Sequence, residues 1–249
     1  MKLDGKIAVV TGGTGGLGWR ICCTLGISGM KIVLVYLNSH QKAERYVEEL
    51  KKNGIQSFAV SADITTEKGI ASVTEKTKDI FGIIDVLILD AAYNKAIPFQ
   101  ALDTLTPEIW DYIVHFNLSA PFLAMRRIGG AMKDNGEGRI VTISSIAGLY
   151  PFGSSIAYCV SKAGLIHLTR CMAVALAPEV LVNCVAPGLM DGTRMTSNLT
   201  PEFTTIARDS TILKRSADKD DVAEAVLTLV RTDSITGQTL VVDSGKVFH

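Results

Sequence analysis

The sequence predicts a single α/β domain built on a doubly wound parallel sheet of about seven strands. Short runs rich in Val and Ile, too short for helices, alternate with longer segments of helical apolar spacing along all 249 residues. This alternation is typical of parallel strands joined by right-handed crossovers. No linker, repeat or low-complexity stretch interrupts 1–249, so one domain is expected over the whole chain.

The candidate strands share this apolar composition and lie at 7–10, 32–36, 57–60, 86–89, 140–143, 181–185 and 239–242. The clearest candidate helices lie between them, at 41–53, 66–80, 106–132 and 156–177, with apolar spacing that suits packing on a sheet. Thr106 followed by Pro107 is a typical helix start. The irregular stretch 188–200 leads into a short helix-like piece. We expect 188–212 to be a substrate loop, because long loops in compact domains are usually functional.

Bulk composition excludes several classes of function. Lys plus Arg equals Asp plus Glu, at 25 each, so no basic excess indicates a nucleic acid or membrane partner. No apolar run approaches the roughly 20 residues of a membrane helix, and the start of the chain does not resemble a signal peptide. Five cysteines without C-x-x-C spacing indicate reduced thiols and a cytoplasmic location. The four scattered histidines predict no metal site.

A glycine-rich turn follows the first strand and leads into a helix: Thr11-Gly12-Gly13-Thr14-Gly15-Gly16-Leu17-Gly18. Glycines allow a tight turn and a close approach of the backbone to a pyrophosphate, and the helix N-terminus then faces the anion. At the first strand–helix junction of an alternating chain, this pattern predicts a Rossmann-type dinucleotide site. Its expected contacts are Gly12, Thr14, Gly15, Gly16, Leu17 and Gly18. The alternative is a tight turn without a ligand.

The end of the second strand decides which dinucleotide binds. NAD enzymes usually place a carboxylate there for the ribose 2′-hydroxyl. The residues here are Tyr36-Leu37-Asn38-Ser39-His40, and the first acid downstream is Glu44. We therefore expect NADP(H) to be preferred, with NAD(H) possible, and Tyr36, Asn38 and Ser39 in contact, helped by His40 or Lys42. Asp63 and Ile64, after the third strand, would lie near the adenine. Asp63 is equally well interpreted as a helix cap.

Tyr158 and Lys162 lie four residues apart and share one face of a predicted helix. A free tyrosine has a pKa near 10, and a neighbouring ammonium together with the cationic oxidised nicotinamide would lower it towards neutrality. The phenol would then act as acid and base on a carbonyl or alcohol oxygen. A surface pair is the default interpretation of this spacing. Three further polar features favour a site: Ser144-Ser145 closes a strand, Asn117 interrupts a long helix, and Pro187-Gly188 follows another strand.

Together these motifs resemble the single-domain branch of the short-chain dehydrogenase/reductase family. The matching segments are Thr11-Gly12-x-x-x-Gly16-x-Gly18, 140–145, Tyr158-x-x-x-Lys162, 183–188 and 236–238. The resemblance implies that Ser145, thirteen positions before Tyr158, hydrogen-bonds the substrate oxygen and that Tyr158 is the acid/base. It implies that Lys162 holds the nicotinamide ribose and lowers the tyrosine pKa, while Asn117 anchors a water. It further implies a homotetramer or homodimer and a small-molecule carbonyl or alcohol substrate.

The resemblance also implies cofactor contacts at Ala91, Ala92, Pro187, Gly188 and Thr193, beyond those already given. Two departures stand out. Asp90 replaces an Asn of the family pattern, and Thr193 comes five residues after Gly188 where the family has four. Arginines that the family uses for acyl-carrier-protein thioesters correspond to Gly136 and Glu179, which argues weakly against that substrate.

The sequence thus predicts an oxidoreductase that moves a hydride between NADP(H), or NAD(H), and a carbonyl or secondary alcohol. A 3-oxoacyl-thioester reductase remains an alternative, since the framework is similar to ketone reductase and 3-oxoacyl-thioester reductase members. A non-catalytic dinucleotide-binding protein is the alternative from another class, which the intact Asn117, Ser145, Tyr158 and Lys162 disfavour. The residues around the expected site would line an apolar substrate pocket or merely close loops: Tyr93, Asn94, Tyr150, Phe152, Met190 and Met195.

Overall fold

The computed structural model describes residues 1–193, 195, 196 and 201–248, apart from the side chains of Pro201 and Phe203. Its strands are β1 (Ile7–Thr11), β2 (Lys31–Tyr36), β3 (Ser57–Ser61), β4 (Val86–Leu89), β5 (Gly138–Ile143), β6 (Val180–Pro187) and β7 (Thr239–Val242). They form one sheet in the order β3-β2-β1-β4-β5-β6-β7, and all neighbours pair in parallel. The predicted doubly wound sheet of about seven strands is confirmed.

The α-helices are α1 (Gly16–Ile27), α2 (His40–Lys52), α3 (Glu67–Ile80), α4 (Pro107–Val114), α5 (Ala120–Ala124), α6 (Gly130–Asp134), α7 (Ile156–Leu176), α8 (Pro201–Asp209) and α9 (Lys219–Arg231). Helices α4 to α6 are joined by two π-helical turns, η2 (His115–Ser119) and η3 (Met125–Gly129). The result is one helical run over 107–134, close to the predicted 106–132.

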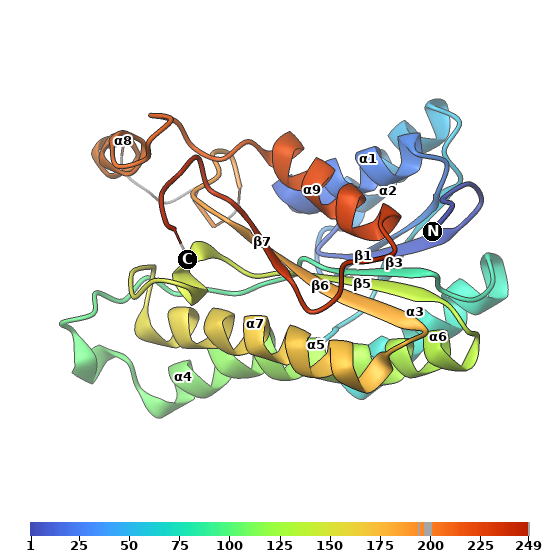
Figure 1. The fold of residues 1–249 in the computed structure, drawn as a ribbon, viewed down its shortest axis with the longest axis horizontal. Helices are drawn as coiled ribbons and strands as arrows, with labels where there is room; N and C mark the ends of the chain where they lie inside the picture. The colour runs from blue at the N-terminus through green and yellow to red at the C-terminus, as the bar shows by residue number, and fades with distance from the viewer. Residues whose placement is uncertain (194, 197–200, 249) are drawn as a thin grey trace.

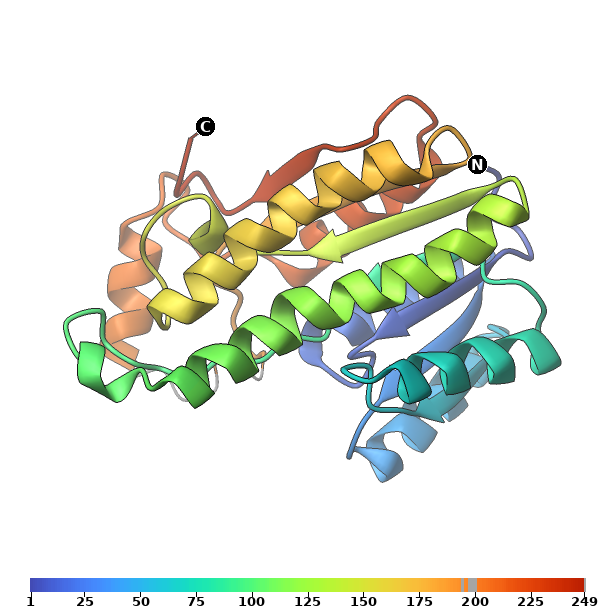
Figure 2. The same ribbon diagram turned by 90° about the horizontal axis from the view of Figure 1, so that it is seen from below.

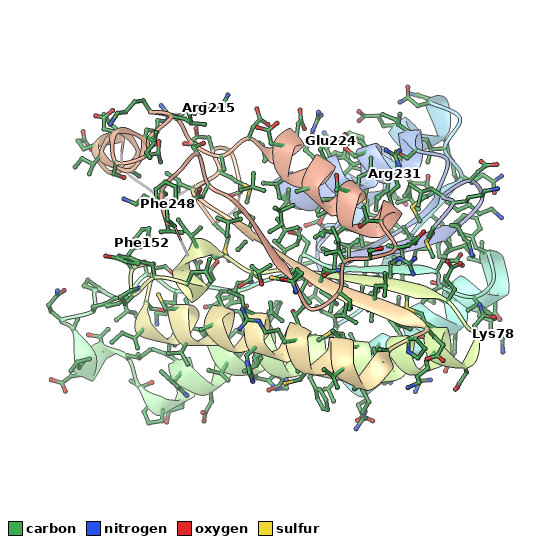
Figure 3. The ribbon with its side chains drawn as sticks, in the orientation of Figure 1. Lys78, Phe152, Arg215, Glu224, Arg231 and Phe248 are labelled. Atoms are coloured by element: carbon green, nitrogen blue, oxygen red, sulfur yellow. The ribbon has the colours of Figure 1, made fainter. Side chains whose placement is uncertain are left out.

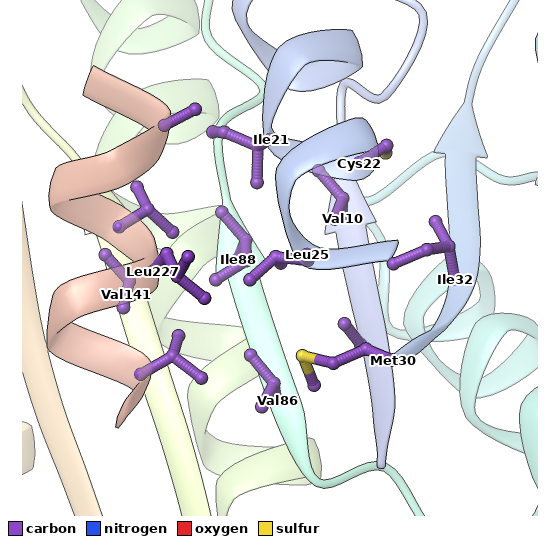
Figure 4. Close-up of a cluster of buried hydrophobic side chains, with 14 of the residues drawn as sticks. Val10, Ile21, Cys22, Leu25, Met30, Ile32, Val86, Ile88, Val141 and Leu227 are labelled. Atoms are coloured by element: carbon purple, nitrogen blue, oxygen red, sulfur yellow. The ribbon is translucent and has the colours of Figure 1, made fainter. Parts of the chain in front are cut away.

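The helices cover both faces of the sheet. Helices α1, α2 and α9 lie on one face, and α3, the run α4–α6 and α7 lie on the other (Figures 1 and 2). Alternate residues of a strand supply the two cores: Val10 packs with α1 and α9, whereas Val9 packs with the opposite layer. Figure 4 shows Val10, Ile88 and Leu227 in the first of these clusters. Burial on both faces explains the continuous apolar strands.

Helix α7 is long and apolar enough to cross a membrane by length and composition alone. Half of its most apolar window is buried inside the protein, and its buried face includes Lys162 and Ser161. A helix packed on a sheet in this way is the core helix of a folded domain. Its apolar character follows from that packing.

Candidate active site

The candidate site lies at the carboxyl ends of the strands, where β1 separates β2 from β4. The chain leaves the sheet in opposite directions at this point, and such a switch point is where open α/β sheets bind ligands. Thr11, the last residue of β1, joins the two sides. Its Oγ1 lies within hydrogen-bonding distance of the backbone nitrogens of Asp90 and Ala91, at 3.1 and 3.2 Å. The glycine turn is thereby fixed against the end of β4.

The glycine turn is packed too closely to admit side chains. Gly12 has φ of +69°, and a Cβ there would lie 3.0 Å from the backbone of Ala91. A Cβ on Gly18 would overlap the carbonyl oxygen of Gly12. Gly15 caps α1 without any side-chain hydrogen bond, so the N-cap residue satisfies none of the first N–H groups of the helix, which are suited to an anion. Thr14 lies half-buried in the turn, whereas Leu17 points into the core, which leaves its backbone as the part that can contact a cofactor.

The adenosine side of the predicted site contains one hydrogen-bonded chain. The Tyr36 hydroxyl lies 2.7 Å from Nδ1 of His40, whose Nε2 lies 3.2 Å from the Glu44 carboxylate. Asn38 and Ser39 are exposed, and the Ser39 side chain does not cap α2. These positions are open to a ligand at the end of β2.

Asp63 is occupied by its own turn. Its Oδ1 accepts hydrogen bonds from the backbone N–H and the hydroxyl of Thr65, at 2.9 and 2.6 Å. Thr66, not Asp63, supplies the side-chain cap of α3. Ile64 is buried in the core beneath the turn. Asp63 therefore closes the turn before α3, and the interpretation of Asp63 as the helix cap is wrong, because Thr66 is the cap.

Helix α7 presents the predicted catalytic pair at its start. Ser155 caps the helix by accepting a hydrogen bond from the Tyr158 N–H at 3.2 Å. The Tyr158 side chain is hydrogen-bonded to Ser145, and Ser145 follows the end of β5. Lys162 is 2 % exposed and donates from Nζ to the carbonyl oxygen of Ile143 at 2.8 Å. Ser145, Tyr158 and Lys162 thus meet at one edge of the sheet.

The electrostatics of this pair in the protein without cofactor differ from those expected for the complex with oxidised nicotinamide. Burial raises the pKa of Tyr158 to about 12, and the hydrogen bond from Ser145 offsets only part of that effect. Burial also lowers the pKa of Lys162 to about 8. Lys162 does not lower the tyrosine pKa below its usual value in the protein alone, because removal from water disfavours the phenolate more than the ammonium favours it.

Asn117 lies in the π-helical turn η2, a rare conformation that is frequent at functional sites. Its side chain is buried and accepts from the Tyr93 N–H while donating to the Tyr93 carbonyl, both at 2.8 Å. Its Nδ2 also lies 3.1 Å from the Ser161 hydroxyl. Asn117 therefore ties the segment after β4 to the catalytic helix. Both N–H groups of its amide are used by these contacts, and its Oδ1 accepts the bond from Tyr93.

Two partners in this network were not found from the sequence. Ser161 bridges Asn117 and the carbonyl oxygen of Tyr158, which accepts its hydroxyl at 2.8 Å. The backbone of Ile143 holds Lys162. Ser161 lies inside the Tyr-x-x-x-Lys motif, so a polar role for it beside the site could have been predicted from its position. The sequence gives no indication of which backbone carbonyl binds Lys162.

Asp90 is partly buried beside the glycine turn. Its carboxylate accepts a hydrogen bond from the Gly18 N–H, and the positive charge of Lys162 acts on it through space. Burial raises the pKa of Asp90 to about 7, even though Lys162 and the Gly18 N–H act in the opposite direction. A titratable group thus occupies the place of an uncharged amide in the family pattern.

The segment after β6 covers the opposite side of the site. Pro187 ends the strand, and Gly188 donates its N–H to the Val242 carbonyl at 2.9 Å. A Cβ on Gly16 would lie 2.9 Å from the carbonyl oxygen of Gly192, so this segment crosses the glycine turn closely. Thr193 follows directly, and its hydroxyl lies 3.0 Å from that of Thr196. Of the predicted loop 188–212, residues 194 and 197–200 lie outside the described residues.

An open pocket of about 440 Å³ lies behind this loop, between α8 and the start of α9. Within it, Arg208 and Asp191 form an ion pair at 2.7 Å, which ties the loop after β6 to α8. Arg215, another lining residue, points outward from this region in Figure 3.

Aromatic side chains gather at the mouth of the site. Tyr93 contacts Tyr112 edge to face at a centroid distance of 4.8 Å, and Phe116 lies 6.2 Å from both. Tyr150 and Phe152 form a second, more exposed pair, and Phe152 is labelled in Figure 3. Tyr93 is half-buried by its neighbours. Asn94, Met190 and Met195 are half-buried as well.

All five cysteines are free thiols. In the part of the chain that the structure describes, no group of three or more His, Cys, Asp or Glu side chains is placed to hold a metal ion.

Comparisons with known proteins agree with this architecture. The sequence profile of the short chain dehydrogenase family matches residues 6–203. A Streptomyces violaceoruber protein assigned as ketoacyl reductase 2 of the granaticin polyketide synthase is 36% identical, over 97% of this chain and 96% of its own length. The 3-oxoacyl-acyl-carrier-protein reductase FabG of a Staphylococcus epidermidis strain is 31% identical, over 96% and 98%. A variant of actinorhodin polyketide ketoreductase, solved with NADPH, superimposes with a TM-score of 0.89 at 25% identity, over 99% and 98%.

The chain belongs to the short-chain dehydrogenase/reductase family. It is an NAD(P)-dependent oxidoreductase that transfers a hydride between the nicotinamide and a carbonyl or alcohol, as the sequence predicts.

Proposed function

We propose that this enzyme is an NADP(H)-preferring ketone reductase or alcohol dehydrogenase in which Tyr158 is the acid/base. The observation that carries this proposal is the placement of the Tyr158 phenol beside Ser145, with the Lys162 ammonium 5.7 Å from the centre of the Tyr158 ring. When bound, the nicotinamide supplies or accepts the hydride. Ser145 would hold the substrate oxygen, and Tyr158 would donate a proton to it during reduction and remove one during oxidation.

The described residues fit a dinucleotide. Glycines at 12, 15, 16 and 18 allow the tight, closely packed turn that brings backbone to a pyrophosphate, and Gly15 places no side-chain cap on the N-terminus of α1. The rest of the cofactor would lie between two segments. One follows β4 and contains Ala91 and Ala92, and the other follows β6 and contains Gly188 and Thr193. Lys162 would reach the nicotinamide ribose. Asn117 would act as a positioning residue through Ser161.

Preference for NADP(H) is supported by the end of β2, which carries no acid, and by cations on the first turns of α2. Lys42 and Arg45 lie over the Tyr46 ring, at 5.4 and 5.5 Å from its centre. Glu44 is held by His40. A 2′-phosphate at Asn38 and Ser39 would meet no acid at the end of β2, and Lys42 and Arg45 add positive charge to the helix that follows.

Titration of the purified protein with NADPH and NADH, followed by nicotinamide fluorescence, tests this preference. The proposal requires tighter binding of NADPH and a loss of that advantage in His40→Ala. Tighter NADH binding would contradict the preference, and binding of neither nucleotide would contradict the dinucleotide site itself.

A 3-oxoacyl-thioester reductase is a second candidate, favoured by the names of two relatives with which the chain shares nearly its full length. Initial rates with NADPH, measured for simple ketones and for a 3-oxoacyl thioester, separate the two. A preference of at least tenfold in kcat/KM for the thioester would establish the second candidate.

We also propose that the enzyme is cytoplasmic and works as a homotetramer or homodimer. Exposed apolar side chains on the layer of α4 to α7 support association between copies, notably Phe122, Val160 and Val174. Sedimentation at micromolar concentration tests this, and a monomer would contradict it.

A further inference from the structure

The Asp90 carboxyl group lies at the N-terminus of α1, where the negatively charged pyrophosphate of the cofactor is expected. Its carboxyl group accepts the Gly18 N–H, which belongs to the first turn of α1. Its Oδ2 would lie 2.9 Å from a Cβ on Gly18 and 3.9 Å from one on Gly15. The carboxylate therefore lies against the helix N-terminus whose N–H groups and dipole are suited to a pyrophosphate.

Few ionisable groups face this carboxyl. Lys162 and Tyr158 face it from α7, and Cys22 faces it from α1. Lys162 is the cation among them and is held in place by Ile143. The backbone of Asp90 is itself fixed by Thr11. The backbone at Asp90 is therefore held beside the helix end at which a second anion would bind.

We propose that Asp90 makes dinucleotide binding proton-linked: the carboxylate and the cofactor pyrophosphate compete for the N-terminus of α1, so that the cofactor binds together with a proton on Asp90. This inference rests on the proposed dinucleotide site. It names a residue that tunes cofactor affinity with pH, a role that an Asn at this position would not have.

The direction of the linkage follows from electrostatics. Like charges disfavour each other, so bound pyrophosphate raises the pKa of Asp90 above its value in the free protein. That value is already about 7. The free protein consequently loses the Asp90 proton as pH rises through neutrality, the complex keeps it, and the affinity for the cofactor falls over the same range.

The test measures dissociation constants for NADH from pH 6 to pH 8, because the pyrophosphate of NADH has no group that titrates near neutrality. We expect the wild-type dissociation constant to rise about tenfold across this range. In Asp90→Asn we expect tighter binding at pH 8 and a rise of less than twofold. Asp79→Asn makes the same chemical change at an exposed position on α3 and should behave as wild type.

Lys162→Met tests whether the pH linkage comes from Asp90 or from the neighbouring ammonium. The ammonium lowers the pKa of Asp90, so its removal should move the pH midpoint of the linkage upward without abolishing it. A linkage that persists unchanged in Asp90→Asn would overturn the inference. So would its absence in Lys162→Met when the dissociation constants are followed up to pH 10. Failure of every variant to bind NADH or NADPH would instead overturn the proposed function, and this inference with it.

Discussion

The Lys162 ammonium lies 5.7 Å from the centre of the Tyr158 ring and is hydrogen-bonded to the Ile143 carbonyl, not to the phenol. It therefore acts on Tyr158 through space. At that separation a unit charge contributes about 3 kcal/mol at the effective dielectric constant near 20 typical of protein sites. This contribution favours the phenolate, while burial opposes it and raises the pKa of Tyr158 to about 12.

Lys162→Met should lower kcat/KM for alcohol oxidation about 100-fold at pH 7, as expected from the loss of about 3 kcal/mol. Oxidation requires the phenolate, so its rate rises with pH until the phenol is ionised. Without the ammonium the pKa of Tyr158 is higher, and the rise should continue to higher pH than in the wild type. Steady-state rates from pH 6 to pH 10 measure this.

Lys78→Met is the matched control, because Lys78 lies at the far end of α3 (Figure 3). It should leave the pH profile unchanged. A loss below threefold in Lys162→Met would contradict the role given to this charge.

Asn117→Ala should destabilise the protein by about 2–4 kcal/mol. The substitution leaves the N–H and carbonyl of Tyr93 without their partner in a partly buried place, and each such loss costs about 1–3 kcal/mol. Urea denaturation measures the change. Asn53→Ala, at an exposed helix end, should change stability by less than about 1 kcal/mol. Equal stability of the two variants would show that the network around Asn117 is not structural.

Gly18→Ala should weaken NADPH binding at least tenfold and lower stability, since its Cβ would overlap Gly12 and approach Asp90. Gly130→Ala is the contrasting change within a helix, where a Cβ meets nothing within 4 Å. It should stabilise the protein by about 0.5–1 kcal/mol, because alanine loses less backbone entropy than glycine. Nucleotide titration and thermal denaturation of both variants check this pair. Unaffected binding in Gly18→Ala would mean that the turn does not hold the dinucleotide.

Asp90→Asn should stabilise the protein at pH 8. The pKa of Asp90 rises from 3.8 to about 7 on folding, so the native state binds more protons than the unfolded state between these values. Wild-type stability therefore falls as pH rises from about 4 to 7, by at most about 4 kcal/mol. Asn has no such dependence. Urea denaturation at pH 5 and pH 8 should show a larger advantage of the variant at pH 8, and an equal difference at both values would contradict this.

Most of the architecture could be predicted from the sequence, because the spacing of apolar residues and the composition of each segment indicate whether it forms a strand or a helix. Strands buried on both faces are continuous apolar runs, and the glycine turn has a spacing that few other structures require. The seven strand positions and the long helical run were accessible in this way. The π-helical turn at Asn117 was not, because it depends on how the helix passes over β4 and α7.

The site was harder to predict where burial decides the chemistry. The spacing of Tyr158 and Lys162 indicated their proximity, but not that removal from water would raise the tyrosine pKa. Asp90 was recognisable as a departure from the family pattern. Asp90 contacts Gly18 and interacts with the charge of Lys162 only because α1 and α7 pack against β4. The residues next to Asp90 in the sequence do not specify that packing.

Tyr158→Phe tests the central claim most directly, because it removes one hydroxyl and keeps the aromatic ring at this position of α7. Single-turnover reduction of a ketone substrate with NADPH should slow about 100- to 10,000-fold, since proton donation by a positioned side chain contributes about 10²–10⁴ in rate. NADPH titration of the same sample should give a dissociation constant within about threefold of wild type. Turnover that is unchanged while NADPH still binds would contradict the assignment of Tyr158 as the acid/base.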